Sequence, residues 1–129
     1  MRELRHKFEV HCSKLGVNGV LHTSALQDGS SHVEKLGDTF HWIVTDRGSE
    51  IERRTTNSRE EVEYWLVRGV VFALSIERVL KIRAAGQDFR RLMYEKRIEI
   101  MKSISRKWGD RIEKEIENLL IEYPYDDGN

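Results

Sequence analysis

The chain has little cysteine and proline, and it has no excess of charge of either sign. Its 129 residues include one cysteine, Cys12, and one proline, Pro124. A single cysteine cannot form an intrachain disulfide, so a disulfide-stapled secreted fold is excluded and a reducing compartment is expected. The 22 basic and 22 acidic residues cancel, which gives bulk charge no role in binding nucleic acid or anionic membranes.

Long apolar runs and cofactor motifs are also missing. No stretch approaches the roughly 18 apolar residues of a membrane span, and the first residues lack the apolar core of a signal peptide. We therefore expect a cytoplasmic protein that is not bound to a membrane. The sequence has no phosphate-binding glycine motif, no Cys-x-x-Cys pair and no two-histidine zinc motif. We predict no cofactor, no metal and no catalytic residue, hence a protein that is not an enzyme.

Apolar periodicity is what the sequence does contain. Helical spacing of apolar residues predicts helices over about 2–15, 59–83, 88–104 and 106–122, and short β-branched and aromatic runs predict three strands within 32–55. The structure of residues 17–31 is left open, because the short apolar run in 17–27 fits either a short helix or irregular packing. A chain of this length commonly forms one domain. The prediction is a single α+β domain over 1–129: an N-terminal helix, a small three-stranded antiparallel meander and three C-terminal helices packed on one core.

Several residues are expected to be structural. The face of the middle strand that carries Trp42 is predicted to meet the core. Gly69 interrupts an apolar helix, which suggests close approach of another backbone or a local kink, and Gly69→Leu is expected to destabilise the fold by overpacking. Asp88 is placed to cap a helix that Phe89 anchors. The full set is Trp42, Trp65, Gly69, Asp88, Phe89 and Trp108.

Charge is unevenly distributed along the second half of the chain. Residues 87–112 carry eight basic and four acidic side chains, whereas 113–129 carry six acidic and one basic. The basic helix 90–111 could bind the phosphates of a nucleic acid through Arg90, Lys102, Arg106 and Lys107. The alternative is that its cations pair with acids inside the fold. Exposed aromatic residues that would stack on bases are lacking in this half, so a nucleic-acid-binding regulator is only the second hypothesis.

Acid–base catalysis by strand residues is a third hypothesis. A histidine could act with a nearby carboxylate as general acid and base. No spacing in the sequence supports such a site, and cross-strand charge pairs are common on exposed sheet faces. The residues in question are His22, His32, His41, Glu34 and Glu52, and a second version of the site combines His41, Glu52, Arg53 and Tyr64.

Several short sequence motifs, taken in order, resemble those of a family of bacterial polymorphic-toxin immunity proteins. They are Asp46-Arg47-Gly48-Ser49-Glu50 with Arg53, Tyr64-Trp65, Asp88-Phe89-Arg90-Arg91, Trp108 and Tyr123-Pro124-Tyr125-Asp126-Asp127. The resemblance runs from about the middle strand to the C-terminus. It implies a small cytoplasmic protein encoded beside a toxin of contact-dependent growth inhibition or a related secretion system, which binds the toxin domain and blocks it stoichiometrically.

The resemblance also implies a partner, the C-terminal domain of the cognate toxin, which in many such systems is a nuclease with a basic substrate cleft. An inhibitor can fill such a cleft with carboxylates. Inhibition at the active site and at a neighbouring surface are both compatible with the sequence, as are a monomer and a dimer. We call the acidic segment 113–129 the acidic end. Its candidate contacts with the toxin are Glu113, Glu117, Asp126 and Asp127.

Overall fold

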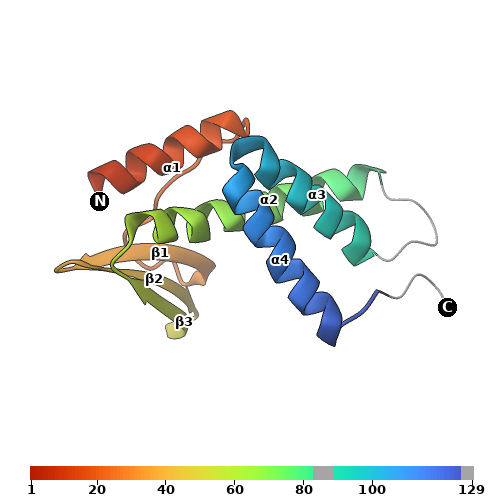
Figure 1. The fold of residues 1–129 in the computed structure, drawn as a ribbon. Coiled ribbons are helices and arrows are strands. Elements are labelled where there is room, and N and C mark those ends of the chain that lie inside the picture. The colour runs from red at the N-terminus through yellow and green to blue at the C-terminus, as the bar shows by residue number, and fades with distance from the viewer. Residues whose placement is uncertain (83–88, 126–129) are drawn as a thin grey trace. The chain divides into compact units, whose positions relative to one another are not determined.

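The computed structural model describes residues 1–82 and 89–125. Its elements are α1 (Arg2–Lys14), β1 (Asp28–Leu36), β2 (Thr39–Asp46), β3 (Ser49–Thr56), α2 (Arg59–Ile82), α3 (Phe89–Ile104) and α4 (Arg106–Glu122) (Figure 1). The predicted α+β order of a helix, a three-stranded antiparallel sheet and three helices is confirmed. The chain forms two compact units, an N-terminal unit (Met1–Val67) and a C-terminal unit (Arg68–Asn129). That all 129 residues act as one domain stays a prediction.

Two tight turns connect the three strands of the N-terminal unit. Leu36 pairs with Thr39, and Asp46 pairs with Ser49, so each loop has two residues. Arg47 and Gly48 have φ angles of 51° and 83°, as in the type I′ turn whose twist matches that of paired strands. Gln27 stabilises this turn, because its backbone C=O accepts the Arg47 N–H at 3.2 Å and its Oε1 accepts the Gly48 N–H at 2.6 Å.

The first strand begins earlier than the sequence predicted. β1 starts at Asp28, which pairs with Asp46, and the register shifts before Ser31. The Asp28 carboxylate accepts the Ser30 hydroxyl, and it accepts the Ser30 N–H at 3.0 Å. These two bonds lower the pKa of Asp28. The polar residues 28–31 have no apolar alternation, so the pattern that indicated the other strands could not indicate this one.

Both faces of β2 contain buried residues, so the Trp42 face meets the core as predicted, but the opposite face is buried as well. Phe40 on the Trp42 face is 6% exposed and Trp42 is half-buried, and Ile43 and Thr45 on the opposite face are 1% and 7% exposed. The segment before β1 covers part of this second face, since the Gln27 N–H donates to Thr45 Oγ1 at 3.3 Å. Sequence periodicity shows which residues share a face, but it cannot show that an irregular segment lies against that face.

The N-terminal unit also contains α1 and the start of α2. α1 buries Leu4, Phe8 and Cys12 along one stripe, and burial raises the pKa of the Cys12 thiol. Gly19 lies so close to this stripe that a side chain there would collide with Cys12 and Phe8. Ser58 caps α2 by accepting the Glu61 N–H at 3.2 Å, as the capping-box sequence predicts.

Stability of the N-terminal unit should depend on pH through His11. Burial lowers the pKa of His11 and outweighs the opposing effect of the Glu63 carboxylate, whose Oε1 lies 3.6 Å from His11 Nε2. The unfolded chain, with an ordinary pKa of about 6.5, therefore binds this proton at a higher pH than the folded chain does. The contribution is fully present above about pH 6.5 and is lost as the pH falls toward the folded pKa.

Urea unfolding of the wild type and of His11→Gln, at about pH 7.5 and at about pH 5.5, measures this effect. We expect the wild type to lose more free energy of unfolding on acidification than the variant loses. The same pH dependence in both proteins would show that His11 does not contribute to it.

α3 and α4 form a helical hairpin in the C-terminal unit. Ser105 ends α3 and caps α4, since its Oγ accepts the Trp108 N–H at 3.1 Å. Phe89 opens α3 and is half-buried, whereas the predicted cap Asp88 lies outside the described residues. The buried residues of the hairpin are Met93, Arg97, Ile100, Met101, Trp108, Gly109, Ile112 and Ile116.

Gly109 lies where α4 closely approaches α3. The prediction that another backbone closely approaches Gly69 is wrong. Gly69 is exposed, and a Cβ built on it would meet no atom of residues 1–82 or 89–125 within 4 Å. A Cβ on Gly109 would lie 3.0 Å from the Cα and 3.1 Å from the backbone N of Lys102 in α3. Helix propensity gives the cost of a glycine, but it does not reveal which glycine faces a neighbour.

Candidate functional site

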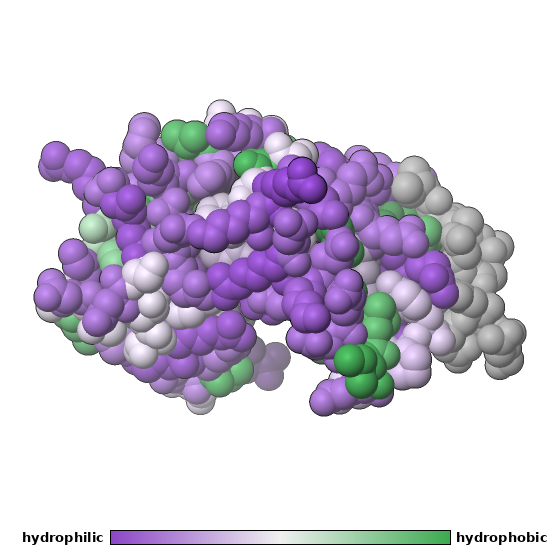
Figure 2. All heavy atoms as spheres, in the orientation of Figure 1, coloured by the Kyte–Doolittle hydropathy of each residue, from purple (hydrophilic) through white to green (hydrophobic). Residues whose placement is uncertain are grey.

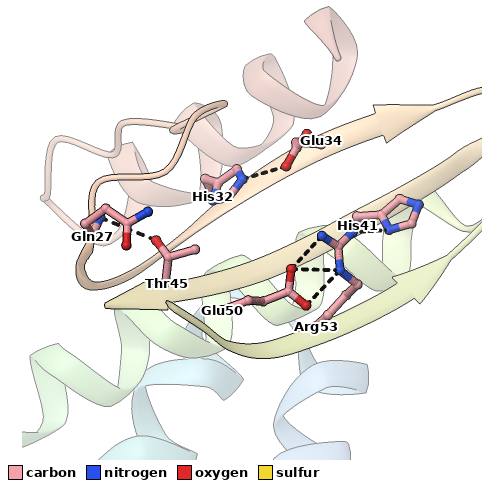
Figure 3. Close-up of polar contacts among 7 residues, drawn as sticks. All are labelled: Gln27, His32, Glu34, His41, Thr45, Glu50 and Arg53. Atoms are coloured by element: carbon pink, nitrogen blue, oxygen red, sulfur yellow. Dashed lines mark hydrogen bonds and ion pairs between the residues drawn. The ribbon is translucent and has the colours of Figure 1, made fainter. Parts of the chain in front are cut away.

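One face of the sheet carries five charged or titratable side chains from all three strands (Figure 3). Register places them together, because Glu34 pairs with His41, and Ile43 pairs with both His32 and Arg53. Residues directly opposite in antiparallel strands project their side chains on the same face. We call this set the polar row; its members are His32 and Glu34 from β1, His41 from β2, and Glu50 and Arg53 from β3.

Hydrogen bonds connect the polar row. His32 Nε2 lies 2.8 Å from Glu34 Oε2, and Arg53 Nη1 lies 2.7 Å from His41 Nδ1. Arg53 also donates to Glu50 Oε1 from Nη2 at 2.6 Å and to Glu50 Oε2 from Nε at 3.1 Å. An arginine can only donate, so the bond to Nδ1 requires His41 to be neutral with its proton on Nε2. The bonds from Arg53 lower the pKa of Glu50, and those to Glu50 raise the pKa of Arg53.

Exposure increases along the polar row from β1 to β3. His32 is 4% exposed and Glu34 and His41 are half-buried, whereas Glu50 and Arg53 are exposed. The β3 end of the row therefore presents a fixed carboxylate and a fixed guanidinium to solvent. Since both carboxylates of the row are already bonded to a cation or a histidine, the arrangement suits recognition of a complementary polar surface.

The structure brings together only part of the residue set proposed for catalysis. His41 and Arg53 are hydrogen-bonded, but Glu52 projects from the other face of β3, where its Oε2 accepts the Arg54 Nε at 2.7 Å. Tyr64 is 0% exposed and belongs to the core. The sequence reasoning missed Glu50, because the bulge between the partners of Val44 and Thr45 shifts its position.

The pairing of Glu34 with His41 was accessible from the sequence. The two-residue turn Gly37-Asp38 fixes the register of β1 against β2, and counting outward from it places these two side chains opposite each other.

The other face of β3 holds Arg54 over two tryptophans. The Arg54 guanidinium lies 5.6 Å from the centre of the Trp42 ring and 5.9 Å from that of Trp65. The two rings are 6.5 Å apart. Each such cation–π contact contributes about 0.5–1 kcal/mol at an exposed site. Trp42 and Trp65, both predicted to be structural, thus contact each other and hold the second arginine of β3 against the sheet.

The acidic end does not form a patch of a single sign within residues 1–82 and 89–125. Glu113 Oε2 accepts Lys102 Nζ at 2.9 Å, and Glu117 lies 4.0 Å from Lys114. Two of the four predicted toxin contacts are therefore next to cations of the same unit. The other two, Asp126 and Asp127, lie outside the described residues.

Cations of the basic helix bind other parts of the C-terminal unit. Arg90 donates to the C=O groups of Tyr123 at 3.0 Å and Pro124 at 2.7 Å, and the Arg91 guanidinium lies 4.1 Å from the centre of the Tyr125 ring. Lys102 is paired with Glu113. The structure therefore engages Arg90 and Lys102, two of the four residues proposed to bind phosphates, and nucleic-acid binding is not favoured.

In the part of the chain that is described, none of the helices is both long and apolar enough to span a bilayer. Hydrophilic side chains predominate on the face drawn in Figure 2, and apolar residues form small separate patches on it.

Comparison with known proteins identifies a family. Residues 37–118 match the family described as Immunity protein 63. This range begins at the turn before β2, covers β2, β3, α2 and α3, and ends within α4; it also contains His41, Glu50 and Arg53 of the polar row. No curated protein and no solved structure matches the chain. The family match extends over more than half of the sequence and confirms the resemblance to immunity proteins. The chain belongs to the Immunity protein 63 family.

Proposed function

We propose that the protein binds the C-terminal domain of a cognate bacterial toxin in the cytoplasm and neutralises it by stoichiometric inhibition, within a polymorphic toxin system of the contact-dependent growth inhibition type. Membership of an immunity protein family over residues 37–118 carries the proposal. An immunity protein needs a surface complementary to its toxin and no reacting groups of its own.

The exposed side of β3 supports this function. Seven of its eight residues are exposed, and the β3 end of the polar row presents a guanidinium and a carboxylate that are already fixed by their mutual bonds. Side chains held in place before binding lose less conformational entropy when a complex forms. Mixed charge also favours one partner over others, because a mismatched surface would bring like charges together.

The acidic end is a proposed second contact if the toxin is a nuclease with a basic cleft. Its residues are Glu113, Glu117, Asp126 and Asp127. Glu117 is the more favourable of the two described carboxylates, since it is exposed and 4.0 Å from Lys114, whereas Glu113 is bound at 2.9 Å by Lys102.

Co-expression tests the proposed function. The toxin domain is taken as the C-terminal domain of the protein encoded by the neighbouring gene, and it is produced in bacteria with and without this chain. We expect growth to stop with the toxin domain alone and to be restored with both, and we expect the purified pair to form a one-to-one complex in light scattering. A non-cognate toxin domain is the control and should not be neutralised. Persistent growth arrest, together with no complex, would rule out the function.

A further inference from the structure

The two edges of the sheet differ in what covers them. At the β1 edge the Val33 N–H donates to the His22 C=O at 2.9 Å, so the segment before β1 occupies that edge. β3 forms the other edge, and within the described residues its one strand neighbour is β2. An edge strand of this kind presents N–H and C=O groups that can pair with a further strand.

The Val33–His22 bond determines which backbone groups of β3 point outward. The N–H and C=O of one strand residue point the same way, so Val33 and its partner Trp42 direct theirs away from each other. Trp42 therefore exchanges bonds with its β3 partner Arg54. Because directions alternate along a strand, Arg53 and Thr55 direct their N–H and C=O groups to the open side.

The side chains of β3 leave this edge accessible. Protected edges usually carry lysine, proline or charges that project across the edge, and β3 has no lysine and no proline. Its two arginines are held over the faces of the sheet. Arg53 is bonded to Glu50 and His41 on one face, and Arg54 lies over Trp42 and Trp65 on the other. The bulge lies at the Ser49 end of the strand, so the pairing from Glu52 to Thr56 is regular.

We propose that the toxin domain docks by adding an extended strand to the β3 edge, with backbone hydrogen bonds to Arg53 and Thr55. This inference rests on the proposed function, because it takes the toxin as the occupant. The two residues offer two donors and two acceptors, and the polar row and Arg54 flank the added strand on its two faces.

Charge disfavours two of the pairings that a second copy of this chain could form at this edge. A symmetric antiparallel pairing of two β3 strands centred on Arg53 or on Arg54 would set an arginine directly opposite its own copy. Like charges in that position are destabilising. A strand of the toxin has no such constraint and can carry residues that complement Glu50, Arg53 and Glu52.

Thr55→Pro tests the proposal, with Thr55→Ala as its matched control. Proline removes the outward N–H but no bond to β2, and edge strands tolerate proline at such positions. Binding is measured by titration calorimetry with the C-terminal domain encoded by the neighbouring gene. We expect Thr55→Pro to bind about tenfold more weakly or worse, because a toxin carbonyl loses its donor, and we expect Thr55→Ala, which keeps that N–H, to bind more tightly than Thr55→Pro.

Equal binding by Thr55→Pro and the wild type would overturn the edge proposal and leave the proposed function standing. Failure of the wild type itself to bind would overturn both. Amide hydrogen exchange of the wild type covers the case in which the proline variant does not fold. The Arg53 and Thr55 amides should exchange more slowly in the complex than in the free chain. Unchanged exchange on binding, or slow exchange in the free chain together with a dimer in light scattering, would contradict the proposal.

Discussion

Gly109→Val is expected to lower the free energy of unfolding by about 3 kcal/mol, which is at the upper end of typical overpacking costs. Even the first added carbon would lie 3.0 Å from the Cα of Lys102, and this neighbour is helix backbone, which cannot rotate away. α3 and α4 would have to separate, and the packing of Met101 and Ile112 beside them would loosen. Urea unfolding followed by circular dichroism measures the loss.

Gly69→Val is the matched control, because it adds the same side chain to a helix glycine whose Cβ would touch none of the described residues. Valine has a better helix propensity than glycine, so we expect this variant to be unchanged or more stable by about 0.5 kcal/mol. Equal losses in the two variants would mean that helix interiors tolerate valine poorly here for reasons other than the contact with Lys102. A stable Gly109→Val protein would show that the two helices can separate at little cost.

Tyr64→Ala is expected to cost about 3–5 kcal/mol, as for other large aromatic side chains removed from a core. Tyr64 is the largest of the fully buried side chains among the described residues. Its removal therefore leaves a cavity that the rest of the N-terminal unit can fill only in part. With a typical stability of about 5–15 kcal/mol for a whole domain, much of the N-terminal unit's stability would be lost. Thermal unfolding by calorimetry gives the change.

Leu36→Ala serves as the comparison for Tyr64→Ala. Leu36 lies in the same unit and is 57% exposed, so its truncation should change stability by no more than about 0.5 kcal/mol. If Tyr64→Ala unfolds at the same temperature as Leu36→Ala, Tyr64 does not support the core, and its place in the catalytic hypothesis would reopen.

The sequence predicted the elements well where a local pattern encodes them. Ser58 and Ser105 directly precede two of the predicted helices, and each caps its helix in the structure; the two-residue turns at 37–38 and 47–48 lie between the strands. Features that depend on a distant segment were not predictable in this way. The contact of Gly109 with Lys102, the cover on the Ile43 face and the start of β1 at Asp28 all depend on what lies opposite in space.

Two of the sequence motifs that resemble the immunity proteins contact each other in the structure. Arg90 and Arg91 of one motif contact Tyr123, Pro124 and Tyr125 of another. These contacts lie within the C-terminal unit, and Tyr123, Pro124 and Tyr125 fall beyond residues 37–118, over which the family matches.

Only part of the candidate interface could be predicted from the sequence. Counting residues outward from the turn at 37–38 places Glu34 opposite His41, but the position of Glu50 depends on a bulge. That the segment before β1 lies along the β1 edge, and not along the β3 edge, could not be predicted from a local pattern.

Cys12 gives the protein a chemical reporter of its own opening. It is the one thiol in the sequence, it is 1% exposed, and burial raises its pKa. Thiol reagents react with the thiolate, so they modify this residue only while α1 has moved away from Gly19 and its neighbours. The labelling rate at low reagent concentration then follows the population of that open form. A bound toxin that stabilises the N-terminal unit would slow the labelling, and the same thiol could thus report complex formation without any added probe site.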